Sequence, residues 1–191
     1  MKGALSRAPA VFLDRDGVLT ELVQRDGVAA SPRRVADFRI VTGAATAVRR
    51  LREYGLRVFV VTNQPDVARG HLSLSELHQM HRLLADSIRP DEIACCPHDD
   101  EPVCACRKPK PGMILDLSTR WAVDLARSFV VGDTWKDVEA GRAAGCRTIL
   151  VGEPIQAQGV AADWVVPTLE GAVSVMEREL GRSGEPSGLR S

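Results

Sequence analysis

The stretch AVFLDRDG at residues 10–17 decides the fold, because a short apolar run ends abruptly in charged residues. Four consecutive apolar residues predict a strand that is buried on both faces of a parallel sheet. A carboxylate at the end of such a strand is costly unless a partner neutralises it. In extended backbone Asp14 and Asp16 point the same way and Arg15 points elsewhere, while Gly17 permits a sharp turn. The stretch therefore predicts a polar site at a strand end.

Three more polar motifs follow along the chain. A carboxylate that faces a phosphate dianion is repelled, so chemistry on phosphate requires a divalent cation and fixed positive charge. Asp133 can join Asp14 as an oxygen ligand for a hard ion. Lys108 supplies a point charge and Thr62 a hydroxyl donor. An isolated DxD also occurs in glycosyltransferase metal sites, but the whole ordered set indicates phosphate transfer. The three motifs are Thr62-Asn63-Gln64, Arg107-Lys108-Pro109 and Gly132-Asp133 with Asp137.

The ordered set resembles the haloacid dehalogenase superfamily of phosphatases, whose four motifs read DxDG, a lone Ser/Thr, a distant Lys and GDxxxD. The resemblance covers most of the chain, from about Val11 to Val166. It implies an α/β fold, a Rossmann-like three-layer sandwich with a mostly parallel central sheet. The short chain implies that no large cap domain is present, which suits an open site for small phosphorylated substrates.

The resemblance also implies roles for the motif residues. Asp14 would be the nucleophile that forms an aspartyl-phosphate. Asp16 would be the general acid for the leaving oxygen and then the base for the hydrolytic water. Thr62 and the backbone amide of Asn63 would hold the transferring phosphoryl group, with Lys108 neutralising its charge.

A magnesium ion is the catalytic cofactor that the resemblance implies. Asp14, Asp133 and the backbone carbonyl of Asp16 would ligate it, and Asp137 would support the metal shell or a nearby amide. Oxygen ligands and cellular abundance favour magnesium over manganese.

A cluster of cysteine and histidine precedes the motif lysine. Three thiols and one imidazole within eleven residues form the ligand set of a closed tetrahedral zinc site. With no open position for water, this zinc would be structural, and it would position Arg107 and Lys108. Cys95 points away in extended backbone and is expected to be a core thiol, with substitution as a ligand the alternative. Cys146 is expected to be packed. The four zinc ligands are Cys96, His98, Cys104 and Cys106.

Within the superfamily, CPH and CxCRKP together with DRDG and TNQ are similar to the heptose 1,7-bisphosphate 7-phosphatases and the related histidinol-phosphate phosphatases. In that group the arginine before the motif lysine contacts substrate, a role that Arg107 would inherit beside Lys108. Arg15, Asn63 and Gln64 are assigned to the phosphate pocket likewise. The implied reaction is hydrolysis of D-glycero-D-manno-heptose 1,7-bisphosphate to heptose 1-phosphate and phosphate.

Two departures from the group pattern bear on the substrate. Pro65-Asp66 follows TNQ where the heptose enzymes commonly have Ser-Gly. Only five residues separate His98 from Cys104, whereas the heptose enzymes commonly have a longer insert between the two halves of the zinc site. Ala68-Arg69-Gly70 still matches the group. Histidinol phosphate and other sugar phosphates therefore stay open as substrates, although neither departure touches the catalytic residues.

Other classes of function account for less of the sequence. A zinc-dependent binding module explains the cysteines but leaves Asp14, Asp16, Thr62 and Asp133 without a role. A redox protein would need an exposed thiolate pair, which bound zinc would protect. A phosphotransferase shares the motifs, because an aspartyl-phosphate can pass to an acceptor other than water.

Composition bounds the partners and the location. A chain of 191 residues with 45% hydrophobic content suits one catalytic domain, expected over residues 1–180. With 25 basic and 25 acidic residues, no overall field draws in nucleic acid or an anionic membrane. No secretory or transmembrane segment is apparent, so we expect a cytoplasmic monomer that acts on a small phosphorylated metabolite.

Alternating strands and helices predict the rest of the fold. Ser73 and Glu76 form the expected capping box of one helix. The segment 20–42 has no strong periodicity and is expected to border the substrate entrance. His78 and His81 are assigned no chemistry, and a disordered tail is expected over 181–191. Helices are expected from 44 to Gly55, over 74–88, from Pro111 to about Val123, over 137–144 and from near Thr168, with further strands at 58–61, 129–132, 148–151 and 163–166.

Overall fold

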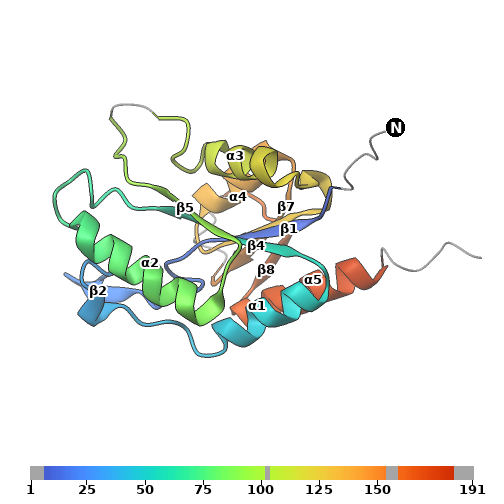
Figure 1. The fold of residues 1–191 in the computed structure, drawn as a ribbon, viewed down its shortest axis with the longest axis horizontal. Helices are drawn as coiled ribbons and strands as arrows, with labels where there is room; N and C mark the ends of the chain where they lie inside the picture. Colours follow the sequence, from blue (N-terminus) through green and yellow to red (C-terminus); the bar gives the residue numbers. More distant parts are fainter. Residues whose placement is uncertain (1–6, 102–103, 154–158, 183–191) are drawn as a thin grey trace, which may run out of the picture.

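A six-stranded parallel sheet forms the centre of the molecule (Figure 1). The computed structural model describes residues 7–101, 104–153 and 159–182. No helix of this part is long and apolar enough to cross a membrane. The elements in chain order are β1 (Ala10–Leu13), β2 (Val23–Arg25), β3 (Val28–Ala30), the 3-10 helix η1 (Val35–Asp37), α1 (Ala44–Glu53), β4 (Arg57–Asn63), α2 (Leu74–Ile88), β5 (Glu92–Cys96), α3 (Gly112–Trp121), the 3-10 helix η2 (Leu125–Arg127), β6 (Phe129–Gly132), α4 (Trp135–Ala144), β7 (Arg147–Val151), β8 (Trp164–Val166) and α5 (Leu169–Arg182).

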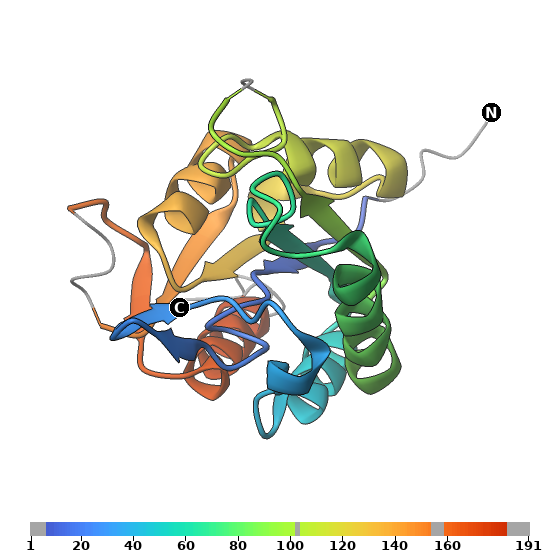
Figure 2. The same cartoon turned by 90° about the vertical axis from the view of Figure 1, so that its left-hand side faces the viewer.

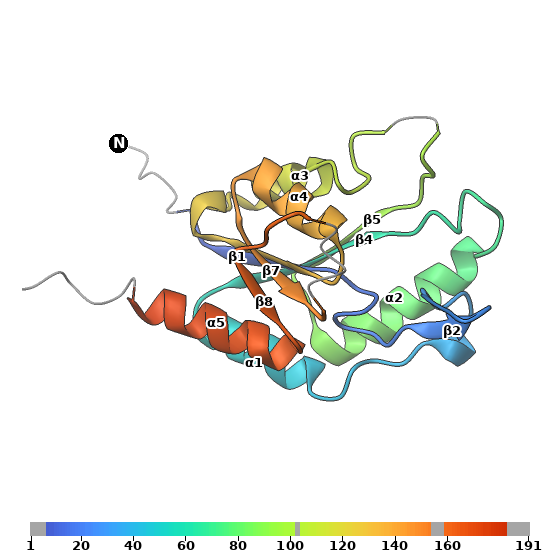
Figure 3. The same cartoon turned by 180° about the vertical axis from the view of Figure 1, so that it is seen from behind.

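Two hydrophobic cores lie on the two faces of the sheet. Successive strand residues point to opposite faces, so Val11 and Leu13 join one core while Ala10 and Phe12 join the other. Helices α1, α2 and α5 cover the first face, and α3 and α4 cover the second (Figures 1 and 3). The expected three-layer α/β sandwich is confirmed.

The strand order places the polar motifs together. The sheet runs β5-β4-β1-β6-β7-β8, so the chain moves outward from β1 in one direction and then from β6 in the other. The reversal lies between β1 and β6, and ligands of open parallel sheets bind outside the carboxyl ends of the strands at such a point. Figure 2 views the molecule from the end where the loops that follow these strands meet.

A short hairpin lies within segment 20–42. Strands β2 and β3 pair antiparallel around Asp26-Gly27, and both turn residues have positive φ angles of 53° and 76°. This is the Asp-Gly turn that suits a two-residue hairpin. The described connection between β1 and α1 contains this hairpin and η1, and no cap domain.

Several element boundaries differ from the expected ones. Edge strand β5 was not expected, because Ile93 is its only residue of high β-propensity. Helix α4 begins at Trp135, two residues before Asp137, because Thr134 is its N-cap. Helix α5 includes Gly181 and Arg182, so the expected tail is wrong at these two residues. The remainder of that tail, 183–191, lies outside the described residues.

The capping box of α2 is half formed. Ser73 Oγ accepts a hydrogen bond from the Glu76 amide at 3.1 Å, as expected. Glu76 does not return a bond to the N-cap, since its Oε2 accepts from the amide of Val35 at 2.5 Å. Glu76 therefore links α2 to η1 and holds the segment after the hairpin against the body of the protein.

Candidate active site

The ends of β4, β1 and β6 surround one cavity of about 270 Å³. Asp14 follows β1, Thr62 and Asn63 end β4, and Asp133 follows β6. Part of segment 20–42 forms a wall of the cavity, as expected. The lining residues are Asp14, Asp16, Leu22, Ala29, Ala30, Ser31, Thr62, Asn63, Pro65, Arg107, Lys108, Asp133, Thr134 and Lys136.

Three carboxylates meet beside this cavity, and two of them, Asp14 and Asp133, line it. One oxygen from each of Asp14, Asp133 and Asp137 lies within 4.8 Å of the others. Burial, partly offset by Lys108, raises the pKa of Asp14 to about 7. Burial and then the charges of Asp14 and Asp137 raise the pKa of Asp133 to about 8. Buried oxygens that repel one another in this way are the donor set that a hard divalent cation prefers.

Gly17 leaves the space that Asp133 occupies. A Cβ atom at this position would lie 2.1 Å from Asp133 Oδ2, and the φ angle of Gly17 is +83°. Any other residue would be strained there and would displace the carboxylate. The fourth residue of the DRDG motif is thus required by the acidic cluster across the cavity.

Lys108 forms ion pairs with two of these carboxylates. Its Nζ lies 2.9 Å from Asp14 Oδ1 and 2.5 Å from Asp137 Oδ1, and it also donates to the Val61 carbonyl at 2.8 Å. Burial acts to lower the pKa of Lys108, but the charges of Asp137 and Asp14 together raise it. Lys108 therefore remains a fixed cation, although only 3% of its surface is exposed.

Asp137 uses both oxygens in the framework of the site. Oδ1 accepts from Lys108, while Oδ2 accepts from the Thr134 amide at 3.2 Å and the Thr134 hydroxyl at 2.6 Å. The same contacts cap helix α4. Gly132 permits this approach, since a Cβ atom there would lie 2.1 Å from Asp137 Cβ. Asp137 is thus placed to support the cluster rather than to face the cavity.

The residues that end β4 hold the lysine and present a hydroxyl. The Asn63 side chain donates to the Lys108 carbonyl at 2.9 Å and accepts from the Lys108 amide at 3.0 Å. This side chain positions the lysine backbone, while Asn63 also lines the cavity. Thr62 Oγ1 accepts from Gln64 Nε2 at 2.9 Å, so its own hydrogen is left to donate into the cavity.

A cysteine and histidine cluster lies directly before Arg107. The sulfur atoms are 3.2 to 3.7 Å apart, and His98 Nδ1 lies 3.3 Å from Cys106 Sγ and 3.5 Å from Cys96 Sγ. The described cysteines are free, and these separations exceed a disulfide bond length of about 2.05 Å. All four ligand atoms lie within 4.8 Å of one another, so Cys96, His98, Cys104 and Cys106 can hold a metal ion.

Comparison with known proteins identifies the family. A model of the HAD-hydrolase-like family matches residues 105–172. D-glycero-beta-D-manno-heptose-1,7-bisphosphate 7-phosphatase of Rhodopseudomonas palustris is 42% identical over 157 residues, which cover 76% of this chain and 84% of that protein. The chain belongs to the haloacid dehalogenase-like hydrolases.

Two further relatives resemble this hydrolase over most of their length. The enzyme of the same name from Yersinia pestis is 37% identical, over 84% of this chain and 91% of that protein. The crystal structure of D,D-heptose 1,7-bisphosphate phosphatase from Bordetella bronchiseptica, complexed with magnesium and phosphate, superimposes with a TM-score of 0.77 at 32% identity. The superposition covers 90% of this chain and 99% of the Bordetella bronchiseptica chain. The likeness therefore extends across the whole fold.

Four donors surround the carboxylate of Asp16 in the hydrolase. Arg15 donates to both oxygens, at 2.9 and 2.7 Å, Thr20 donates to Oδ1 at 2.9 Å and Gln64 donates to Oδ2 at 2.8 Å. Burial acts to raise the pKa of Asp16, but the charge and hydrogen bonds of Arg15 and the bonds from Gln64 and Thr20 lower it. Asp16 is thus an ionised carboxylate at the edge of the cavity.

Arg15 and Gln64 both contact Asp16. Arg15 is 0% exposed and Gln64 is 2% exposed, and neither lines the catalytic cavity. The prediction that both bind substrate, with Gln64 in the phosphate pocket, stays a prediction, and in this structure their side-chain donors are directed at Asp16. Both residues position the carboxylate.

Arg107 does line the cavity, as expected of a residue that contacts substrate. Its Nε donates to Asp100 at 2.9 Å and its Nη1 to the His98 carbonyl at 3.2 Å. These contacts tie the guanidinium to the loop that carries the metal-binding cluster. The loop therefore positions both Arg107 and the next residue, Lys108.

His81 on α2 is the residue that sequence analysis missed. Its Nε2 lies 3.3 Å from Arg15 Nη1. Burial and the Arg15 charge lower the pKa of His81 to about 4, so the ring is neutral at pH 7. A guanidinium only donates, so Nε2 must accept and the ring proton is assigned to Nδ1. His81 thus holds Arg15, which in turn holds Asp16.

We expect His81→Leu to remove a pH-dependent part of the folding stability. The wild-type unfolding free energy falls as pH drops below the unfolded pKa of about 6.5, because the folded pKa of His81 is about 4. Between pH 7.5 and 5.0 the wild type should lose on the order of 1–2 kcal/mol more than the variant in urea unfolding. The matched control is His78→Leu, at an exposed position of the same helix. Equal losses in all three proteins would contradict the assignment.

Proposed function

We propose that this hydrolase removes phosphate from a phosphorylated sugar through an aspartyl-phosphate intermediate. The observation that carries the proposal is that Asp14, Thr62, Lys108 and Asp133 line one cavity, with the lysine ammonium 2.9 Å from Asp14. Lys108 and the Arg15 amide both donate to Oδ1 of Asp14, and neither contact involves Oδ2. Oδ2 is therefore suited to attack phosphorus.

The reaction would proceed in two displacements. An Asp14 oxygen forms a bond to phosphorus while the bond from phosphorus to the sugar oxygen breaks, and Asp16 gives a proton to that oxygen. Asp16 then takes a proton from the water that hydrolyses the aspartyl-phosphate. Thr62 donates to the phosphoryl oxygens and Lys108 offsets their charge. The donors around Asp16 favour its ionised form, so the acid step requires Asp16 to leave part of this network.

Magnesium is the proposed catalytic cofactor. Asp14, Asp133 and the backbone carbonyl of Asp16 would hold it, with Asp137 supporting. When bound it supplies the positive charge that lets a carboxylate approach a phosphate dianion. The raised pKa values of Asp14 and Asp133 support this assignment, because each carboxyl would ionise fully beside a cation.

The proposed substrate is D-glycero-D-manno-heptose 1,7-bisphosphate, cleaved at the 7-phosphate. Support comes from relatives named D-glycero-beta-D-manno-heptose-1,7-bisphosphate 7-phosphatase, which align over most of the chain. Pro65, in the segment that departs from the heptose group, lines the cavity. Histidinol phosphate is therefore the second candidate, because the altered rim lies where the substrate's non-reacting part would pass.

Zinc is the proposed ion of the cysteine and histidine cluster. A tetrahedron with metal–sulfur bonds of about 2.3 Å has sulfur–sulfur edges of about 3.8 Å, and a shorter bond to nitrogen shortens only the sulfur–nitrogen edges. The three sulfur–sulfur separations, 3.2, 3.4 and 3.7 Å, do not exceed this edge, so the thiols are gathered closely enough to share one ion. Four protein ligands would leave no position for water, so the zinc would be structural and would fix the loop that carries Arg107 and Lys108.

The first experiment measures phosphate release, with magnesium present, from both anomers of heptose 1,7-bisphosphate and from histidinol phosphate. We expect turnover of one heptose anomer, and Asp14→Asn should lower kcat at least about a thousand-fold because the nucleophile is lost. Asp26→Asn, in the exposed hairpin turn, is the matched control. Preference for histidinol phosphate would overturn the substrate but keep the mechanism, and full activity of Asp14→Asn would overturn both.

Asp133→Asn tests the magnesium site. Loss of one charged ligand should raise the magnesium concentration for half-maximal activity at least about 10-fold. Asp116→Asn, on the exposed face of α3, should leave the titration unchanged. An unaltered titration for Asp133→Asn would show that Asp133 does not hold the ion.

Cys104→Ala tests the zinc site. Without one of four ligands, zinc content should fall from one ion per chain toward none, and the melting temperature should fall with it. Cys95→Ala is the control, because Cys95 packs on the opposite face of β5 from Cys96. Retention of zinc by Cys104→Ala at the wild-type melting temperature would disprove the ligand assignment.

A further inference from the structure

A second cavity of about 240 Å³ adjoins the catalytic one. Ala30, Ser31 and Pro65 line both, so the two spaces are separated only by the end of the hairpin and the start of the loop after β4. Of the groups named in the steps above, Gln64, which holds Asp16, lines the second cavity and not the first. Its lining residues are Arg25, Ala30, Ser31, Arg33, Gln64, Pro65, Asp66 and Arg69.

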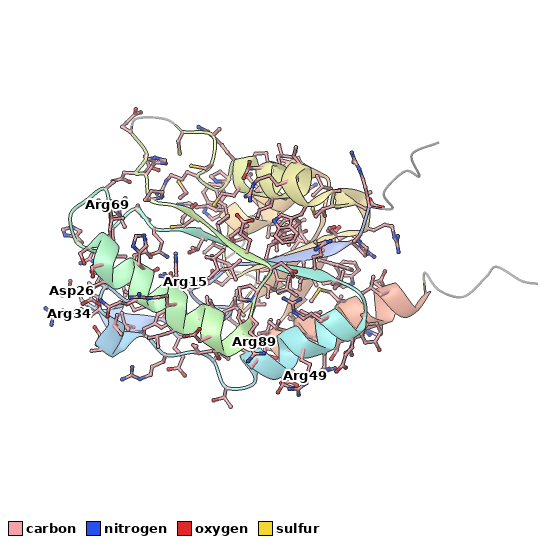
Figure 4. All side chains as sticks on the ribbon, in the orientation of Figure 1. Arg15, Asp26, Arg34, Arg49, Arg69 and Arg89 are labelled. Carbon is pink, nitrogen blue, oxygen red and sulfur yellow. The ribbon has the colours of Figure 1, made fainter. Side chains whose placement is uncertain are left out.

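Arginines dominate the charged side chains that line this second cavity. Its lining holds three guanidinium groups and one carboxylate, so the net charge of these side chains is +2. The arginines belong to three segments: Arg25 ends β2, Arg33 precedes η1 and Arg69 lies in the loop before α2. In Figure 4 the labelled Arg34 and Arg69 lie at the end of the molecule that carries the hairpin. Two of the three are paired with carboxylates, Arg33 with Asp66 and Arg69 with Asp99, so Arg25 carries the charge that is least offset.

Asp66 fixes the geometry of the arginines without neutralising them all. Its carboxylate accepts two hydrogen bonds from Arg33, at 2.6 and 3.1 Å. Arg25 Nη1 is 3.9 Å from the same carboxylate, while its Nη2 donates to the Ser31 carbonyl at 2.8 Å. Arg25 is thus held by a backbone bond, with its charge only distantly offset.

Arg69 is held from the other side. Its guanidinium donates two bonds of 2.6 Å to Asp99, in the loop that follows β5. About 41% of the Arg69 side chain and about 29% of the Arg25 side chain remain exposed, so both can meet a ligand from solvent. The pocket is therefore built from braced rather than freely moving arginines, and pre-organised donors lose less entropy when they bind.

We propose that this second cavity, centred on Arg25, binds the second phosphate of the substrate, the one that is not hydrolysed. The inference rests on the proposed function, because it requires a bisphosphorylated sugar with its reacting phosphate at Asp14. Arginine forks match phosphate oxygens in geometry, and Arg25 supplies a positive charge that the Asp66 carboxylate, 3.9 Å away, offsets only in part. Asp66, which departs from the heptose group pattern, and the hairpin together shape this pocket.

The test compares heptose 1,7-bisphosphate with heptose 7-phosphate, which lacks the second phosphate. Arg25→Gln should raise KM for the bisphosphate at least about 10-fold, leave kcat within about two-fold and leave both constants for the monophosphate unchanged. The control is Arg34→Gln, an exposed neighbour that does not line the cavity. Arg69→Gln serves as a second variant, and circular dichroism with a melting curve confirms folding of each protein.

The outcomes separate this inference from the proposed function. Hydrolysis of the bisphosphate with equal KM in wild type, Arg25→Gln and Arg69→Gln would overturn the inference and keep the function. A KM effect confined to Arg107→Gln would place the second phosphate at the loop after β5 and overturn it equally. If wild type releases no phosphate from the bisphosphate, the proposed function fails, and this inference fails with it.

Discussion

The site depends on one buried cation, the ammonium of Lys108, which lies between Asp14 and Asp137. Without it, three carboxylates within 4.8 Å of one another, two after buried strands and one on α4, would carry a large desolvation and repulsion cost. With it, Asp137 can stay buried and cap α4, and Asp14 keeps one oxygen clear of the lysine. The same ion pair therefore serves the helix, the sheet edge and the chemistry.

The parallel sheet explains why groups so far apart in sequence meet with this accuracy. Strand β1 lies between β4 and β6, and all three run in one direction, so their last residues arrive at one edge. Lys108 comes from a loop instead, and its position is set by Asn63 at the end of β4 and by the Val61 carbonyl. Strand β4 thus fixes Lys108, although this residue comes from a loop.

Much of the fold and most of the catalytic cavity could be predicted from sequence. Continuous apolar runs mark buried strands, and Asp14, Thr62, Lys108 and Asp133 lie together as their motifs indicate. The roles of Arg15, Gln64 and His81 could not be read in this way. Their positions depend on how α2 packs against the loop after β1, which periodicity along one segment does not reveal. The hairpin was missed although Asp26-Gly27 signals it, because its strands have only three residues each.

The position of Lys108 depends on two parts of the molecule that fold for different reasons: the sheet, through Asn63, and the loop after β5. The sheet, its two cores and the acidic cluster involve β1, β4 and β6 and their covering helices. The described residues of the loop after β5, 98–101 and 104–108, are held by the contacts of His98, Cys104 and Cys106 with one another and with Cys96, and by a few ion pairs. If the proposed zinc fixes this loop, a newly made chain without it would contain the complete scaffold, with Lys108 held only by its contacts to β4 and to Asp14 and Asp137. Maturation of the catalyst would then follow metal supply rather than translation.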